Sequence, residues 1–213
     1  MGEVIVLSEV LQDRSRPVRG LAAFFFALDC PLSYLAAEQV ERALGEIDWV
    51  PVLAGDSRGS EPANESDRVR AAQERMSLAE RQARTLNLPL VEPHRYPFDA
   101  RPVSRAAVYA AEHGVGARFA LAAMRLAFCG GFDLSNPNVI GEAAEVAGLQ
   151  AAEAVVAAGA ARYDAGLDAT SRGLASRGVS APAIRIGKRW CQGVDVVTCA
   201  SMSRGMQVDG HAG

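Results

Sequence analysis

The spacing of apolar residues changes twice in the first part of the chain, and each change predicts the boundary of an element. Residues 21–28, LAAFFFAL, form a continuous apolar run, which is typical of a strand buried on both faces of a sheet. From Pro31 to Leu44, apolar residues recur at helical spacing, with the proline in the first turn. Residues 47–53 then have the composition of a second strand. We therefore predict a β-α-β unit with parallel strands.

A longer middle region has the pattern of successive helices. Residues 54–64 and the proline-rich segment 89–102 have the composition of loops. The charged helix between them carries an apolar stripe at alternating steps of three and four residues. The predicted helix boundaries are Asn64 as an N-cap and Pro89 as a stop, Ser104 as an N-cap with Gly114 after the helix end, a mostly apolar helix over 117–129, Asn136 and Pro137 at the next helix start, and alanine-rich helices as far as Ser176.

The C-terminal region returns to a strand pattern. Residues 182–186 alternate with period two, Gly187 and Lys188 are a hairpin-turn signal, and residues 189–192 form the returning strand before a final short helix. One sheet split by a helical insertion is the α/β fold that this order predicts. The predicted boundaries are 21–56 and 177–205 for the discontinuous sheet domain, 57–176 for the helical insertion, and 1–20 and 206–213 for flexible termini.

Composition and charge exclude several classes of protein. The 213 residues are 49% hydrophobic, with 22 basic and 25 acidic side chains, so neither disorder nor the basic surface of a nucleic-acid-binding protein is expected. No stretch approaches the length of apolar residues that a membrane span requires. The first twenty residues have neither a basic n-region nor a long apolar h-region, and we expect a cytoplasmic protein.

Four cysteines occur in the chain, and none belongs to a Cys-x-x-Cys pair. We therefore expect four free thiols and a reducing compartment. Cys30 lies where the first strand gives way to the first helix, and the helix N-terminus should lower its thiol pKa below about 8.5, although neighbouring Asp29 would oppose this. The alternative is a small buried hydrophobic residue, which is the role we expect for Cys129.

The segment FFFALDCPLSYLAAEQVERAL carries a family resemblance. It resembles the active-site segment of 2-hydroxychromene-2-carboxylate isomerases and kappa-class glutathione transferases, in the DsbA-like branch of the thioredoxin superfamily. On that pattern Cys30 takes the place of the catalytic serine, Pro31 and Ser33 match the following proline and second serine, and Tyr34 begins the helix. The resemblance implies a thioredoxin-like mixed sheet with a large all-helical insertion, and it makes Cys30 and Ser33 the catalytic candidates.

Three further segments extend the resemblance to about 190 residues. Residues 162–164, Arg-Tyr-Asp, are similar to an element of hydroxychromene isomerases. The Ala181-Pro182 bond matches a cis-proline that lies beside the family's active site, and Asp195 matches an acidic residue that holds the γ-glutamyl end of glutathione. The substrate- or thiol-binding residues implied are Pro31, Tyr34, Ala181, Pro182, Val194 and Asp195. Glutathione or another low-molecular-weight thiol is the cofactor implied, with a homodimer as the assembly.

The sequence also departs from the family pattern. Ser33 stands where DsbA-type oxidases have a resolving cysteine, and Cys191 is the thiol that could come near Cys30 instead. Val194 and Val196 replace polar residues of the glutathione site, and Ser104 stands where an asparagine is expected. His94 is a candidate substrate contact from the proline-rich loop. The histidines have no spacing that suggests a metal site, and we expect no metal.

Three functions remain open from the sequence. The first is an isomerase that acts on a conjugated small molecule by thiolate addition, bond rotation and elimination. The second is a monothiol oxidoreductase or glutathione transferase-like protein that forms mixed disulfides at Cys30. The third is a binding protein that kept the fold without the chemistry, which an unperturbed Cys30 pKa and a closed cleft would favour. In each case the partner is a small molecule, with no nucleic acid and no membrane.

Overall fold

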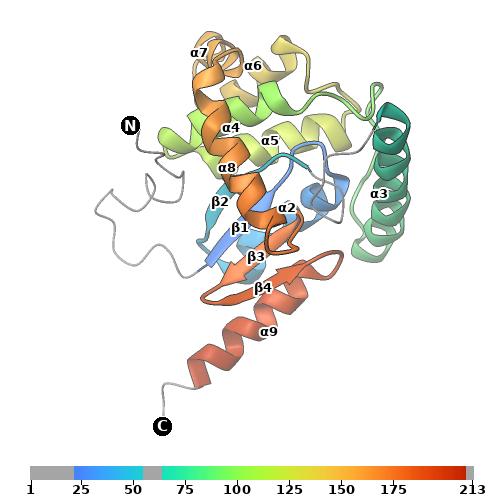
Figure 1. The fold of residues 1–213 in the computed structure, drawn as a ribbon, viewed down its shortest axis with the longest axis vertical. Helices are drawn as coiled ribbons and strands as arrows, with labels where there is room; N and C mark the ends of the chain where they lie inside the picture. Colours follow the sequence, from blue (N-terminus) through green and yellow to red (C-terminus); the bar gives the residue numbers. More distant parts are fainter. Residues whose placement is uncertain (1–21, 55–63, 210–213) are drawn as a thin grey trace.

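A four-stranded mixed sheet forms the centre of the computed structural model, which describes residues 22–54 and 64–209 (Figure 1). The strand order is β2-β1-β3-β4, with β1 parallel to β2 and the other neighbours antiparallel. The bounds are β1 Ala22–Phe26, β2 Asp48–Pro51, β3 Ala183–Ile186 and β4 Arg189–Gln192. The predicted β-α-β unit and C-terminal hairpin are therefore confirmed.

Aromatic side chains pack across the centre of this sheet. Phe24 pairs in register with Trp49 on β2 and with Ile184 on β3. The Phe24 and Trp49 rings meet edge to face, with their centroids 5.0 Å apart, a geometry that aromatic pairs favour. The first strand is thus joined to a strand from the far end of the chain, as a sheet interrupted by an insertion requires.

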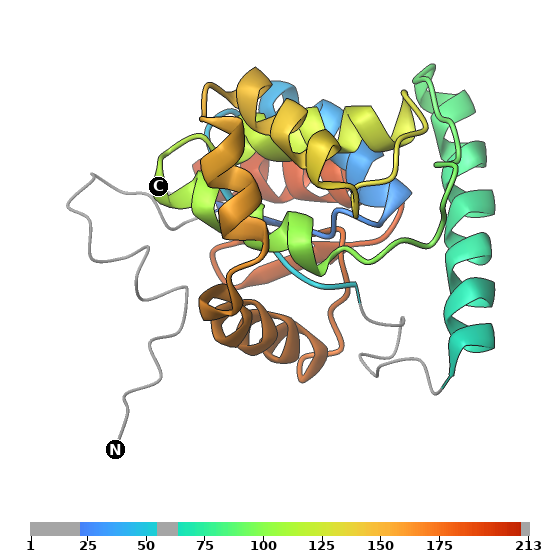
Figure 2. The same ribbon diagram turned by 90° about the horizontal axis from the view of Figure 1, so that it is seen from above.

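Helices α2 (Pro31–Leu44) and α9 (Val196–Asp209) pack together on one face of the sheet. Helix α2 begins with a proline at its first position, where no backbone N–H is needed. It ends at Gly45, whose φ of +66° is accessible to glycine without strain. Helix α8 (Asp164–Ala175) crosses the opposite face of the sheet, as Figures 1 and 2 both show.

The helical insertion begins with α3, which stands at one side of the molecule in both views (Figure 2). Asn64 caps it as predicted, since its side chain accepts a hydrogen bond from the Asp67 N–H at 2.9 Å. Asn87 in the left-handed conformation ends the helix before Pro89 is reached. The helices of the insertion before α8 are α3 (Glu65–Leu86), α4 (Arg101–Glu112), α5 (Gly116–Phe128), α6 (Pro137–Ala147), α7 (Ala151–Ala158) and the 3₁₀ turn η1 (Ala161–Tyr163).

The start of α4 corrects one predicted boundary. The helix begins three residues before Ser104, which is fully buried inside the first turn rather than capping it. The Asp99 carboxylate accepts a hydrogen bond from the Arg101 N–H at 3.0 Å, and Pro102 supplies helical φ in the first turn. The other end agrees with the prediction, since Gly114 follows the helix with φ of +75°. Asn136 likewise caps α6 as predicted.

The cysteine assignment is also corrected. Cys191 on β4 and Cys199 in the first turn of α9 form a disulfide, with their Cα atoms 5.8 Å apart. The turn at Gly193, where φ is +86°, brings the two residues together although eight positions separate them. Two thiols are free instead of four, at Cys30 and Cys129. The prediction of a reducing compartment rested on four free thiols, and the disulfide removes that support.

Some predictions fall outside the described residues: Leu21 at the start of the first strand, the expected N-terminal tail 1–20, loop residues 55–63, and 210–213 with His211. The last helix continues to Asp209, past the expected domain end at 205. Within residues 22–54 and 64–209, no helix combines the length and the apolar character needed to cross a membrane.

Candidate functional site

Cys30 lies at the end of β1 and occupies the N-cap position of α2. Its carbonyl oxygen accepts hydrogen bonds from the N–H groups of Ser33 and Tyr34, which forms the first helical turn around it. Its Sγ lies 4.0 Å from the carbonyl oxygen of Ala181, in the segment before β3. The side chain is only 1% exposed. The end of β1 and the segment before β3, far apart in the sequence, thus meet at one buried cysteine.

Ser33 supports this sulfur from one turn along α2. It is completely buried, and its Oγ accepts a hydrogen bond from the Ala27 N–H at 3.2 Å. That bond uses an oxygen lone pair and leaves the hydroxyl hydrogen available to Cys30. Hydrogen bonds from the Ser33 backbone and side chain both act to lower the pKa of the Cys30 thiol.

The expected low pKa of Cys30 is nevertheless wrong. Burial raises the pKa of the thiol, because a thiolate loses its hydration in the interior, and this effect exceeds those of Arg75 and Ser33, which lower it. Asp29 raises it further, in the direction anticipated from the sequence. Position at a helix N-terminus therefore does not by itself produce a reactive thiolate here.

Arg75 on α3 is the functional candidate that the sequence analysis missed. It is the cation whose charge acts most strongly on Cys30, and its charge acts on the Tyr96 hydroxyl as well. The Tyr96 hydroxyl also donates a hydrogen bond to the Asp29 carbonyl oxygen at 3.2 Å. Arg75 follows Ala72 by three residues and precedes Ala79 by four, so it lies on the apolar face of its helix. An arginine on the apolar face of a helix was the signal in the sequence that could have identified this candidate.

Pro182 and Ala181 lie where the resemblance implies. The Ala181-Pro182 peptide is cis, and so is the Tyr96-Pro97 peptide. The Pro182 carbonyl oxygen accepts a hydrogen bond from the Gly193 N–H at 3.3 Å, which connects the two ends of the C-terminal hairpin. Val194 is half-buried beside this connection and Asp195 is exposed. The structure thus brings Cys30 and Ala181 together and leaves Asp195 free to meet solvent.

Tyr34 and His94 make their hydrogen bonds to parts of the chain other than the Cys30–Ala181 contact. The Tyr34 hydroxyl donates to the Pro89 carbonyl oxygen at 3.0 Å and lies 3.0 Å from Cys129 Sγ, so both of its polar roles are filled within the protein. Burial raises the pKa of this tyrosine. His94 is exposed, and its backbone N–H is bound to the Gly131 carbonyl oxygen. Pro31, at the first position of α2, is buried.

The Arg-Tyr-Asp segment has a structural role. Asp164 receives two hydrogen bonds from the Arg105 guanidinium, at 2.8 and 2.6 Å, and a third from Arg101. The bonds from Arg105 are the main reason that the pKa of Asp164 is lowered. Arg162 lies over the Tyr163 ring at 4.7 Å. This segment joins α8 to α4.

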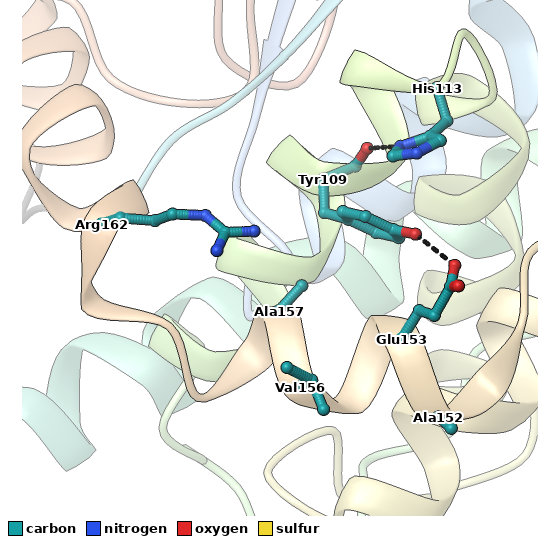
Figure 3. A pocket seen from close by; sticks show the side chains of 7 residues that line it. All are labelled: Tyr109, His113, Ala152, Glu153, Val156, Ala157 and Arg162. Carbon is teal, nitrogen blue, oxygen red and sulfur yellow. Dashed lines mark hydrogen bonds between the residues drawn. The ribbon is translucent and has the colours of Figure 1, made fainter.

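A surface hollow lies on the helical insertion, and Figure 3 shows the side chains that line it. It has a volume of about 450 Å³ and is wide open to solvent. The Tyr109 hydroxyl donates a hydrogen bond to Glu153 at 2.7 Å across it, while His113 Nδ1 lies 2.8 Å from the Tyr109 carbonyl oxygen. Its lining residues are Tyr109, His113, Ala152, Glu153, Val156, Ala157 and Arg162. Neither it nor the hollow at the end of α3 includes Cys30.

Metal ligands do not gather in the described residues, where no group of three or more histidine, cysteine or acidic side chains could hold an ion. The groups that the structure brings near Cys30 are the Ser33 hydroxyl, the Arg75 guanidinium and the Ala181 carbonyl oxygen.

Comparison with known proteins agrees with this geometry. No curated protein matches the chain by sequence. Among solved structures, a 2-hydroxychromene-2-carboxylate isomerase is 16% identical with a TM-score of 0.71, covering 90% of this chain and 97% of its own. The probable DsbA oxidoreductase from Streptomyces coelicolor is 19% identical with a TM-score of 0.64, covering 90% and 91%. The cytosolic disulfide reductase DsbM from Pseudomonas aeruginosa, solved with GSH, is 18% identical with a TM-score of 0.64, covering 88% and 98%.

At these identities the neighbours establish the fold and leave the reaction open. The family assignment comes from the sequence itself, because residues 23–200 match the model of the DsbA-like thioredoxin domain. That match spans both parts of the sheet domain and the helical insertion between them. The chain belongs to the DsbA-like thioredoxin family.

Proposed function

We propose that the protein is a thiol-dependent isomerase of conjugated small organic molecules, with Cys30 as its nucleophile. The observation that carries the proposal is the placement of all four cysteines. Cys191 and Cys199 are bonded to each other, and Cys129 lies against the Tyr34 hydroxyl. With Ser33 in the second motif position, Cys30 has no assigned partner for dithiol exchange, whereas addition to a double bond needs only one thiol.

The reaction is balanced without an oxidant or a net proton change. The Cys30 sulfur forms a C–S bond as its thiol proton leaves, and the π electrons of the C=C bond move onto the oxygen of a conjugated carbonyl group, which takes up that proton. The former double bond is now single and rotates. Return of the electrons and of the proton to the sulfur breaks the C–S bond and leaves the geometric isomer. Ser33 and Arg75 stabilise the sulfur anion at the start and end of this cycle.

The burial of Cys30 sets a condition on this reaction, since substrate must displace side chains that cover the sulfur. Arg75 and Tyr96 are half-buried polar neighbours of the site, which makes them the candidates for that movement. A native protein in which Cys30 resists every alkylating reagent would support a binding protein without chemistry instead.

Isomerisation of cis-configured α,β-unsaturated ketones, followed by ultraviolet absorbance, tests the proposal. We expect turnover by the wild-type protein without added thiol, loss in Cys30→Ser, and retention in Cys129→Ser, which is the matched control for the other free cysteine. If Cys30→Ser were fully active once glutathione was added, the thiolate would belong to glutathione and direct attack by Cys30 would be ruled out.

A monothiol oxidoreductase or glutathione transferase-like function is the second candidate. The placement of Ser33 favours it equally, and DsbM, a disulfide reductase with GSH, has the same fold. This function predicts that oxidised glutathione leaves a mixed disulfide on Cys30, visible by intact mass and absent from Cys30→Ser. Isomerisation without any such adduct would exclude it.

The proposal also covers the assembly, the cellular location and the co-substrate of the protein. A homodimer and a cytoplasmic location are part of it, supported by the family resemblance and by the cytosolic location in the name of DsbM. Glutathione, or another low-molecular-weight thiol, is the proposed co-substrate, with exposed Asp195 to meet its amino end. Light scattering and titration calorimetry with glutathione test these two points, and an Asp195→Asn variant should weaken the binding.

A further inference from the structure

The two halves of the Cys191–Cys199 disulfide differ in their exposure to solvent. Cys191 is 4% exposed, whereas Cys199 in the first turn of α9 is an exposed residue. The strand that carries Cys191, β4, is the last of the sheet, and α9 follows it at the edge of the molecule (Figure 1). Exchange of a disulfide requires a thiolate to reach one of its two sulfur atoms. The structure therefore offers Cys199, and not Cys191, to a thiol from solution.

The buried half of the disulfide has a hydrogen-bond acceptor beside it for the reduced state. Cys191 Sγ lies 3.9 Å from the Oγ of Ser203, which is 4% exposed. The Ser203 hydroxyl donates its own proton to the Cys199 carbonyl oxygen at 2.9 Å, so its oxygen keeps a lone pair that can accept from a thiol. The Cys191 thiol formed on reduction would thus be buried with a partner, which avoids the cost of an unsatisfied polar group.

The disulfide also closes a turn that is bonded to the segment before β3. The Gly193 N–H donates to the Pro182 carbonyl oxygen at 3.3 Å. The Ser180 N–H donates to Gln192 Oε1 at 3.1 Å. Because the two cysteines lie on either side of Gly193, their bond limits the freedom of the turn that makes both contacts.

The segment before β3 in turn contacts the thiol at the start of α2. The Ala181 carbonyl oxygen, between the two hydrogen-bonded residues of that segment, lies 4.0 Å from Cys30 Sγ. Cys30 is only 1% exposed, so a reagent reaches it when local opening uncovers it. A continuous set of contacts thus connects the disulfide to the surroundings of Cys30.

We propose that Cys191–Cys199 is a redox modification site, at which a low-molecular-weight thiol attacks Cys199 and opening of the disulfide makes Cys30 more accessible. The thiolate forms a mixed disulfide with Cys199 while Cys191 leaves as a thiolate and takes up a proton. A second thiolate then attacks the small-molecule sulfur of the mixed disulfide. The Cys199 thiolate leaves and is protonated, and the small disulfide departs. Two thiols thus supply the two electrons and two protons that the protein gains.

This inference does not depend on the reaction proposed for Cys30, because it concerns only how easily that thiol is reached. Reduction removes the covalent restraint on the turn at Gly193, and the two hydrogen bonds to the segment before β3 then hold the turn alone. Local opening of that segment should therefore become more frequent. Cys129 has no such connection, since its Sγ lies 3.0 Å from the Tyr34 hydroxyl on α2.

The site of thiol attack is tested with two single variants that each leave one of the paired cysteines free. Oxidised glutathione should form a mixed disulfide with Cys199 in Cys191→Ser, and peptide mass spectrometry locates the adduct. Cys199→Ser is the matched variant, and its buried Cys191 should be modified much more slowly. Modification of Cys191 as fast as that of Cys199, or of neither residue, overturns the inference.

Alkylation of Cys30 tests the connection to the disulfide in the wild-type protein. The protein is reduced with tris(2-carboxyethyl)phosphine, the phosphine is removed, and labelling by iodoacetamide is followed by peptide mass spectrometry. We expect reduction to speed the labelling of Cys30 about tenfold, which corresponds to about 1.4 kcal/mol of local stability. Cys129, the other free thiol, is the internal control and should be labelled at the same rate in both states.

A variant with both Cys191→Ser and Cys199→Ser should label Cys30 at the faster rate, with or without prior reduction. An unchanged rate for Cys30 after reduction of the wild type overturns the inference, and so does a Cys30 that is labelled in neither state. Equal acceleration at Cys129 would mean that the whole protein loosens, which also overturns it. Since no isomerisation is measured, these outcomes leave the proposed reaction untouched, and an inactive protein with the expected labelling would contradict that reaction alone.

Discussion

Ser33→Ala removes a hydroxyl group that serves the fold and the candidate nucleophile at once. The side chain is completely buried and its Oγ is the acceptor for the Ala27 N–H, at 3.2 Å. Without that acceptor, a buried backbone N–H loses its partner, which costs about 1–3 kcal/mol of unfolding free energy. The same change removes the hydroxyl donor from Cys30, so the pKa of the thiol should rise further above its usual value.

Urea denaturation and the pH dependence of Cys30 alkylation measure these two effects separately. Ser33→Ala should unfold at lower urea, and the midpoint of its alkylation profile should move to higher pH. Ser201→Ala is the control, because that hydroxyl donates only to a carbonyl oxygen of its own helix and is partly exposed. A Ser33→Ala protein with wild-type stability and an unchanged alkylation midpoint would refute the assignment of Ser33 to both roles.

Three further predictions concern the site and the scaffold. Ser33→Cys supplies a second thiol three residues after Cys30, and we expect it to gain an intramolecular disulfide and dithiol reductase activity in an insulin reduction assay; no disulfide after oxidation would contradict the family alignment. Asp164→Asn breaks a partly exposed carboxylate–arginine pair and should cost about 1–2 kcal/mol at neutral pH. Because the folded pKa of Asp164 is lowered, its stabilisation is present above the unfolded value of about 3.9 and disappears as pH falls through the folded value, so wild type and variant should converge in acid. Cys199→Ser opens a short loop and should cost about 2 kcal/mol by urea denaturation, and a reducing agent should lower the stability of the wild type by the same amount while leaving the variant unaffected.

Local patterns in the sequence predicted most of the elements, because each depends on neighbouring residues. The apolar run at Phe24, the proline at position 31 and the caps at Asn64 and Asn136 all act within a few residues, and the structure confirms them. Ser104 failed as a cap because Asp99 and Pro102 start the same helix earlier, a competition between nearby signals.

The features that sequence analysis missed depend on contacts between distant residues. The effect of a helix N-terminus on Cys30 is local, but its burial depends on tertiary packing that brings Ala181 to within 4.0 Å of the sulfur, and this burial reversed the expected pKa. Arg75 reaches the site through the packing of one helix on another. The Cys191–Cys199 bond depends on a turn whose geometry the spacing alone does not encode.

The burial of Cys30 also has a consequence for the lifetime of the protein under oxidative stress. Oxidation of cysteine to sulfinic and sulfonic acids proceeds through the exposed thiolate, and it is irreversible for most proteins. Cys30 is only 1% exposed, and burial raises the pKa of its thiol, so both conditions for this oxidation are disfavoured. The same enclosure that a substrate of the proposed reaction would have to open therefore limits irreversible oxidation of this thiol.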